Sequence, residues 1–140
     1  MIKLIIPIIT LITLSFFVSS YYVGNDYGVD VIKMNKLLSS IPVEYFDGLD
    51  SIYFSNSEVR FRGEGTGEGR FDFWDCGRTT IRIGMFNNNS LETNKFVLLH
   101  ELGHLDELMN NDEWYKVNLL NESYADDFAY KNMNMFEVKN

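Results

Sequence analysis

A chain of 140 residues is the size of one domain, and its net charge of −8 lacks the cationic field that draws in a nucleic-acid backbone. A composition of 46% hydrophobic and 23% charged residues supports a packed core and argues against a disordered chain. The single cysteine, Cys76, excludes an intrachain disulfide. We expect it to be a small, partly buried side chain.

The N-terminal segment is apolar and precedes the expected folded domain. One positive charge is followed by an apolar run over residues 4–18, and residues 18–20 resemble the small-residue cleavage site of a secretory signal. An uncleaved anchor is the alternative, because the run reaches membrane-spanning length when extended to Val23. We expect residues 1–20 to be a signal peptide or membrane anchor and residues 21–140 to be a single domain. The protein is then expected to be secreted or periplasmic, with or without a membrane tether.

Short elements are predicted through the first half of this domain. Apolar residues at helical spacing predict a helix over residues 29–38, before Pro42. Alternation of apolar and polar residues predicts strands, and the alternating glycines of residues 63–69 predict a flexible hairpin connection. The predicted strands are residues 51–54, 59–62, 70–74 and 79–86.

Two helices are predicted after the strands. Ser90 can cap a helix over residues 91–109, because its hydroxyl can accept an unpaired backbone N–H. The last helix is expected to begin near Asn118 or Asn121 and to end near Lys131. Strands followed by helices predict an α+β domain with a small antiparallel or mixed sheet.

The two histidines of the chain lie four residues apart in the segment His100-Glu101-Leu102-Gly103-His104. On a helix, this spacing places both imidazoles on one face, where they can converge on a single Zn²⁺ ion. Glu101 points away from the direct ligand position and can reach a water molecule beside the metal instead. The segment therefore predicts a hydrolytic metal site with Glu101 as general base.

A third ligand is expected from the last helix. Catalytic zinc sites usually have three protein ligands and one open position. Glu122, Ala125, Asp126 and Ala129 share one helical face, and the two alanines allow close approach to the histidine helix. We expect Glu122 to be the third ligand and Asp126 to accept the outer N–H of a metal-bound imidazole.

These two segments resemble those of the Glu-type zincins, and Glu122–Ala129 looks most like the compact ImmA/IrrE-type and CAAX-endopeptidase-type patterns. The resemblance implies a zincin-like fold, in which a small sheet packs on an active-site helix and a ligand-bearing helix follows. It also implies that His100, His104 and Glu122 bind zinc, with Glu101 as general base and acid. By the same resemblance, the strand 79–86 is the sheet edge that borders the cleft.

Many zincins also supply a Tyr, His or Arg that stabilises the oxyanion of the tetrahedral intermediate. No third histidine exists, so the candidates are Tyr115, Tyr124, Tyr130 and Arg82. We place Tyr124 first as a catalytic residue, because it lies next to the ligand face of its helix.

The sequence thus predicts a zinc-dependent metallopeptidase that acts on a peptide or protein substrate. Two alternatives stay open: a catalytically inactive protein whose zinc only joins two helices, and a membrane-tethered interaction protein with incidental histidines.

Overall fold

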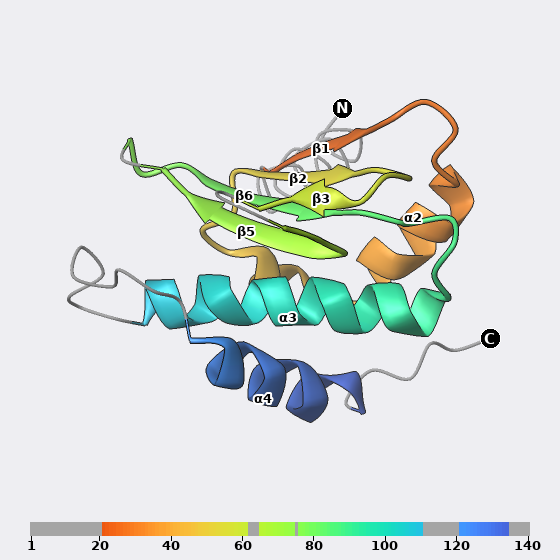
Figure 1. Cartoon of the computed structure of the whole chain (residues 1–140). Coiled ribbons are helices and arrows are strands. Elements are labelled where there is room, and N and C mark those ends of the chain that lie inside the picture. The colour runs from red at the N-terminus through yellow and green to blue at the C-terminus, as the bar shows by residue number, and fades with distance from the viewer. Residues whose placement is uncertain (1–20, 62–64, 75, 111–120, 135–140) are drawn as a thin grey trace, which may run out of the picture.

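The computed structural model describes residues 21–61, 65–74, 76–110 and 121–134 and has an α+β architecture (Figure 1). The long helix α3 (Leu91–Met109) lies between a four-stranded sheet and the helix α4 (Glu122–Met133). The predicted signal peptide or anchor, residues 1–20, lies outside the described residues. Within the described ranges, no helix is both long and apolar enough to cross a bilayer.

The sheet is mixed, which confirms the predicted class. Its strand order is β1-β2-β6-β5, and the first three of these strands run parallel while β5 is antiparallel to β6. A separate two-stranded ribbon joins β3 to β4. The bounds of the strands are β1 (Tyr22–Asn25), β2 (Ser51–Phe54), β3 (Val59–Arg60), β4 (Thr66–Gly67), β5 (Gly69–Phe73) and β6 (Thr79–Ile83).

The strand predicted over residues 79–86 is not the edge of the sheet, so that expectation is wrong. The observed strand β6 is shorter and lies between β2 and β5, with both of its backbone edges hydrogen-bonded. The hairpin turn after β5 places β5 outside β6, and β5 then lies along α3 (Figure 1). Strand β5 is therefore the edge on the side of the histidines.

Cys76 lies in this hairpin turn and is exposed, so the expectation of a partly buried thiol is also wrong. The turn closes through hydrogen bonds from the Trp74 N–H to the Arg78 carbonyl and from the Gly77 N–H to the Trp74 carbonyl, both 2.8 Å. Gly77 has a positive φ of 82°, a conformation that glycine adopts without strain. At this tight turn the Cys76 side chain points into solvent.

The helix α2 (Val31–Ser39) confirms the first predicted helix, with Asp30 as its N-cap. The Asp30 side chain accepts the Lys33 backbone N–H at 3.0 Å. A short 3-10 helix, η1 (Val43–Phe46), follows Pro42 and was not predicted. The first strand, β1, was also not predicted, because Tyr22 and Val23 continue the apolar N-terminal run and Gly24 and Asn25 are unusual in strands.

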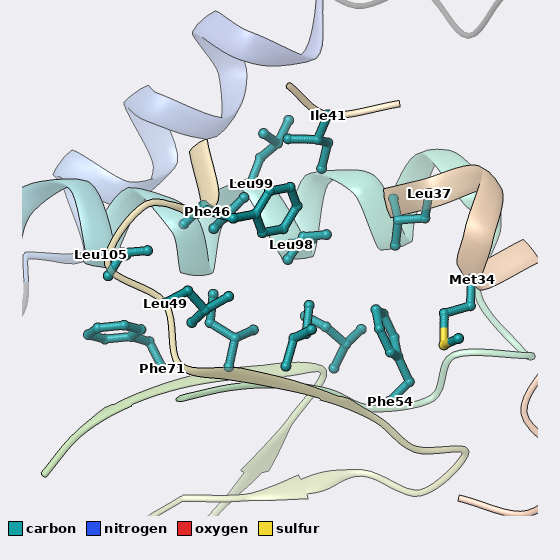
Figure 2. Packing of buried hydrophobic residues seen from close by; sticks show 14 of the residues in the cluster. Met34, Leu37, Ile41, Phe46, Leu49, Phe54, Phe71, Leu98, Leu99 and Leu105 are labelled. Carbon is teal, nitrogen blue, oxygen red and sulfur yellow. The ribbon is translucent and has the colours of Figure 1, made fainter. Parts of the chain in front are cut away.

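The core lies between the sheet and the face of α3 that points toward it (Figure 2). Phe54 and Phe71 rise from the sheet toward Leu98 and Leu105 of α3, and Phe46 of η1 fills the same layer. Each such side chain stabilises the fold by roughly 1.5–3 kcal/mol when it is fully removed from water. This layer fixes the position of α3, and therefore of its histidines, against the sheet.

Lys33 is one of the residues that hold the loop between β6 and α3. The ammonium group of Lys33 donates to the carbonyls of Phe86 at 2.9 Å, Asn87 at 3.4 Å and Asn89. The Ser90 hydroxyl then accepts the Thr93 backbone N–H at 3.0 Å, as the sequence predicted, and α3 begins at the next residue after this cap. These contacts determine where along the sheet the helix starts.

Helices α3 and α4 cross at Gly103. A Cβ atom at this position would lie 2.9 Å from the Ala125 Cα atom and 3.1 Å from the Phe128 Cβ atom. Ala125 and Ala129 are fully buried on the facing side of α4. The small residues of both helices therefore allow α4 to lie directly on the histidine helix.

We predict that Gly103→Ala destabilises the fold by roughly 1–2 kcal/mol, because the steric cost of overpacking exceeds the gain in helix propensity of about 1 kcal/mol. The free energy of unfolding in urea measures this change. Ser123→Ala, an exposed substitution on α4, is the control and is expected to change it by less than about 0.5 kcal/mol. Equal stability of Gly103→Ala and the wild type would contradict the close crossing.

Candidate metal centre

Helix α3 presents His100 and His104 on one face, one turn apart. Their ring centroids are 4.9 Å apart and the ring planes are perpendicular. The exposed fraction of the side chain is 17% for His100 and 5% for His104. Both imidazoles are therefore largely buried and do not lie on a solvent-exposed face of the helix.

Glu122, the first residue of α4, reaches both imidazoles. Its Oε2 atom lies 3.0 Å from the His100 Nε2 atom, and its Oε1 atom lies 3.4 Å from the His104 Nε2 atom. The three ligand atoms lie within 4.8 Å of one another. The structure thus brings together the three residues that the sequence predicted as metal ligands. They come from two helices separated in sequence by residues 111–120, which lie outside the described residues.

The first turn of α4 is attached to α3 by polar contacts as well as by packing. The Asn121 backbone N–H donates to the Glu107 carboxylate at 3.1 Å, and the Tyr124 hydroxyl donates to the Asp106 carboxylate. The Asn121 side chain caps α4 by accepting the Tyr124 backbone N–H at 3.2 Å. Glu122 is therefore held at its place although its side chain is 74% exposed.

Asp126 lies one turn further along α4 and contacts His100. Its Oδ1 atom is 2.9 Å from the His100 Nδ1 atom. A carboxylate at Nδ1 favours the tautomer in which this nitrogen carries the proton, which leaves the Nε2 lone pair for a metal ion. The position agrees with the orienting role predicted for Asp126.

Burial lowers the pKa of His104, an effect that the charge of Glu122 opposes and the neighbouring His100 reinforces. The neutral imidazole is the form that binds a metal ion. The His104 Nδ1 atom is buried and has no hydrogen-bond partner in the described part of the chain. The ligand atom that His104 offers is Nε2, which lies 3.4 Å from the Glu122 Oε1 atom.

Glu101 points from α3 toward the edge strand β5 and is 5% exposed. The Phe71 backbone N–H of β5 donates to its carboxylate. A Cβ atom at Gly69 would lie 2.4 Å from the Glu101 Oε1 atom, so the carboxylate occupies space that only a glycine leaves open. Burial, followed by the charges of Glu122 and Asp72, raises the pKa of Glu101 to about 8.

These residues line one open cleft of about 470 Å³. Its walls come from α3, from the start of α4, from β5 and from the residue after β3. The lining residues are Phe61, Gly69, Arg70, Phe71, His100, Glu101, His104 and Glu122. A carboxylate outside the ligand set and three ligand atoms therefore share one space that is open to solvent.

The predicted oxyanion-stabilising residues do not line this cleft. The Tyr124 hydroxyl donates to Asp106, and this hydrogen bond raises the pKa of Tyr124 to about 12. Tyr130 packs its ring edge-on against Phe96, and Arg82 lies on the sheet among residues of a different depression. Tyr115 lies outside the described residues. The catalytic role of Tyr124 stays a prediction.

The sequence reading missed the contributions of β5 and of Phe61 to the cleft. Arg70 forms an ion pair with Asp72 at 2.7 Å, and both side chains are largely buried. The available signal was the glycine tract at residues 63–69, whose last member permits the contact with Glu101. Spacing along one strand gives no information about which helix that strand will meet.

Two imidazole nitrogens and one carboxylate oxygen, with an exposed side, form a donor set that fits a divalent transition-metal ion. No protein-family model matches this chain, and comparison with curated proteins and with solved structures also finds no match. The case for the site therefore rests on its own geometry.

We predict that Asp126→Asn weakens metal binding by about ten- to a hundred-fold, because a neutral amide polarises the His100 imidazole less than a carboxylate does. Competition with a chromophoric zinc chelator measures the affinity. Asp127→Asn, an exposed neighbour on the same helix, is the control and is expected to keep the wild-type affinity. Equal affinities for the two variants would remove Asp126 from the site.

We predict that the metal-free protein loses stability as the pH rises from 6.5 to 8. The raised pKa of Glu101 means that the folded state holds a proton there that the unfolded state, with an ordinary value of 4.5, has released. Folding then takes up a proton, so the stability falls by at most about 1.4 kcal/mol per pH unit. The pKa of His104 is lowered from 6.5, so its opposite contribution is confined to lower pH.

Thermal unfolding in the presence of a chelator, between pH 6.5 and 8, measures this loss. Glu101→Gln is expected to remove most of it, because the amide does not ionise. Glu92→Gln, an exposed change at the start of α3, is expected to keep the wild-type slope. If Glu101→Gln loses stability with rising pH as the wild type does, a group other than Glu101 causes the loss.

Proposed function

We propose that this protein is a zinc-dependent metallopeptidase. The observation that carries the proposal is the convergence of His100, His104 and Glu122 within 4.8 Å, in the same cleft as the buried carboxyl group of Glu101. A site that only joins two helices has no use for a carboxyl group held beside the ligands. Catalytic zinc sites with three protein ligands and an open fourth position have this donor set.

The proposed chemistry assigns one role to each group. A bound zinc ion would polarise the scissile carbonyl and lower the pKa of water. Glu101 accepts a proton from the attacking water as the new C–O bond forms, and passes a proton to the amide nitrogen as the C–N bond breaks. Asp126 orients His100 through its Nδ1 atom.

The pKa of Glu101 suits this proton transfer. Burial disfavours its ionised form, and the Phe71 N–H partly offsets this effect, so its pKa lies near neutrality without a metal ion. A base whose pKa is near the working pH can both accept and return a proton. The positive charge of a bound ion would favour the ionised form that accepts the proton.

An extended polypeptide fits the outer edge of β5 better than any other surface of the cleft. The Glu68 carbonyl accepts the Gly84 N–H, and the Trp74 N–H donates to the Arg78 carbonyl, at the two ends of β6. Because the direction of the backbone groups alternates along a strand, those of Gly69 and Phe71 point away from β6. Both residues line the cleft. The Phe71 N–H already donates to Glu101, so a substrate strand would pair with the remaining outward groups of these two residues, in the manner of β-strand addition. The apolar segment of residues 1–20 supports action outside the cytoplasm as part of this proposal.

We predict that Glu101→Gln binds about one zinc ion per chain, as the wild type does, but cleaves peptides at least a hundred-fold more slowly. The amide has the same size as the carboxyl group and cannot accept the proton from water. Metal analysis and digestion of a broad peptide library, followed by mass spectrometry, measure the two properties on residues 21–140.

His104→Ala is expected to lose both zinc and cleavage, whereas Glu92→Gln is expected to keep both. A wild-type protein that stays folded and metal-free when zinc is supplied would contradict the proposal. Zinc-loaded wild-type protein that cleaves no library peptide would favour a structural metal instead.

A further inference from the structure

Phe61 is an aromatic side chain at the mouth of the cleft that the chemistry above leaves unassigned. It follows β3 directly, and its side chain is 43% exposed. It lines the same cleft as the metal ligands and Glu101. An apolar ring kept in contact with solvent beside a reactive centre is a candidate for contact with a ligand.

The ring is supported from one side by glycine backbone. A Cβ atom at Gly67 would lie 2.4 Å from the Phe61 Cζ atom, and one at Gly65 would lie 3.4 Å from its Cδ2 atom. The Phe61 N–H also donates to the Gly65 carbonyl at 3.1 Å. The backbone at Gly65 and Gly67 thus lies against the ring, in space that a side chain at Gly67 would share with it.

The charges around the cleft narrow the class of substrate side chain that suits this ring. The carboxyl groups of Glu101 and Glu122 line the same space, and the net charge of the chain is −8, so an acidic side chain is disfavoured. The guanidinium group of Arg70 also lines the cleft, but its ion pair with Asp72 at 2.7 Å compensates its charge, so it does not select the substrate side chain. Phe71, which also lines the cleft, adds a second aromatic surface that is 8% exposed.

We propose that Phe61 determines specificity, by packing against a large apolar side chain of the substrate next to the scissile bond. This inference rests on the proposed function, because it names the substrate class of that same cleft. Contact between an aromatic ring and an apolar side chain removes both from water and adds a specific packing energy. An apolar pocket of this kind discriminates between side chains by about ten- to two-hundred-fold.

The first test compares two peptides that differ only by leucine or alanine beside the cleaved bond. Wild-type, zinc-loaded protein is expected to cleave the leucine peptide with at least a ten-fold higher kcat/KM. Phe61→Ala is expected to lose most of this ratio, mainly through a lower kcat/KM on the leucine peptide. Tyr22→Ala, which removes an exposed aromatic residue from β1 outside the cleft, is expected to keep the ratio.

A second variant changes the position of the ring without removing it. Gly67→Ala adds a methyl group whose closest neighbours are atoms of the Phe61 ring, so it displaces the ring. The ratio is expected to fall in Gly67→Ala, and Gly67→Ala is expected to have no further effect when added to Phe61→Ala. This comparison applies even if the single Phe61→Ala change lowers stability.

A binding measurement separates this inference from the proposed function. NMR titration of Glu101→Gln with the capped leucine and alanine peptides reads the preference without any cleavage, with or without zinc. At least five-fold tighter binding of the leucine peptide, lost with Phe61→Ala, supports the inference even if the protein cleaves nothing. Equal binding of the two peptides, or a preference that survives both Phe61→Ala and Gly67→Ala, overturns it.

Discussion

The close crossing of α3 and α4 is the contact on which the metal centre depends. Two histidines on one helix supply only two ligands, and the third comes from a helix that must lie against the first. Gly103 and Ala125 allow this approach, because neither carries a side chain that would separate the backbones. Polar contacts from Asp106 and Glu107 then hold the first turn of α4, where Glu122 is located. The ligand geometry is therefore a consequence of helix packing as much as of ligand chemistry.

The sequence predicted the parts of the site that are encoded locally. The spacing of His100 and His104 along a helix determines their shared face, and Ser90 marked the start of that helix correctly. The last helix was expected to begin near Asn118 or Asn121, and α4 begins directly after Asn121, whose side chain caps it. The convergence of Glu122 on the histidines required one further assumption, that the alanine face of α4 meets α3, and the packing of Ala125 and Ala129 agrees with it.

The contributions of the sheet could not be predicted, because they depend on strand order. Alternation identified the strands at residues 51–54 and 70–74, but it does not say which strand lies at the edge of the sheet. Parallel pairing of β2 with β6 leaves the other side of β6 for β5, and this arrangement places Gly69 and Phe71 against Glu101. The first strand, β1, was missed for a different reason: Tyr22 and Val23 were counted with the apolar N-terminal run, and Gly24 and Asn25 are unusual in strands.

The hydrogen bond between the Phe71 N–H and Glu101 links the general base to the strand that is proposed to hold the substrate. Because strand pairing has a period of two, a one-residue slip of β5 would reverse which of its amides face outward. Such a slip would remove the Glu101 contact and place a side chain where Gly69 now leaves space. Substitutions can therefore change the side chains around the cleft, but Glu101 keeps its backbone partner only while β5 keeps its register with β6.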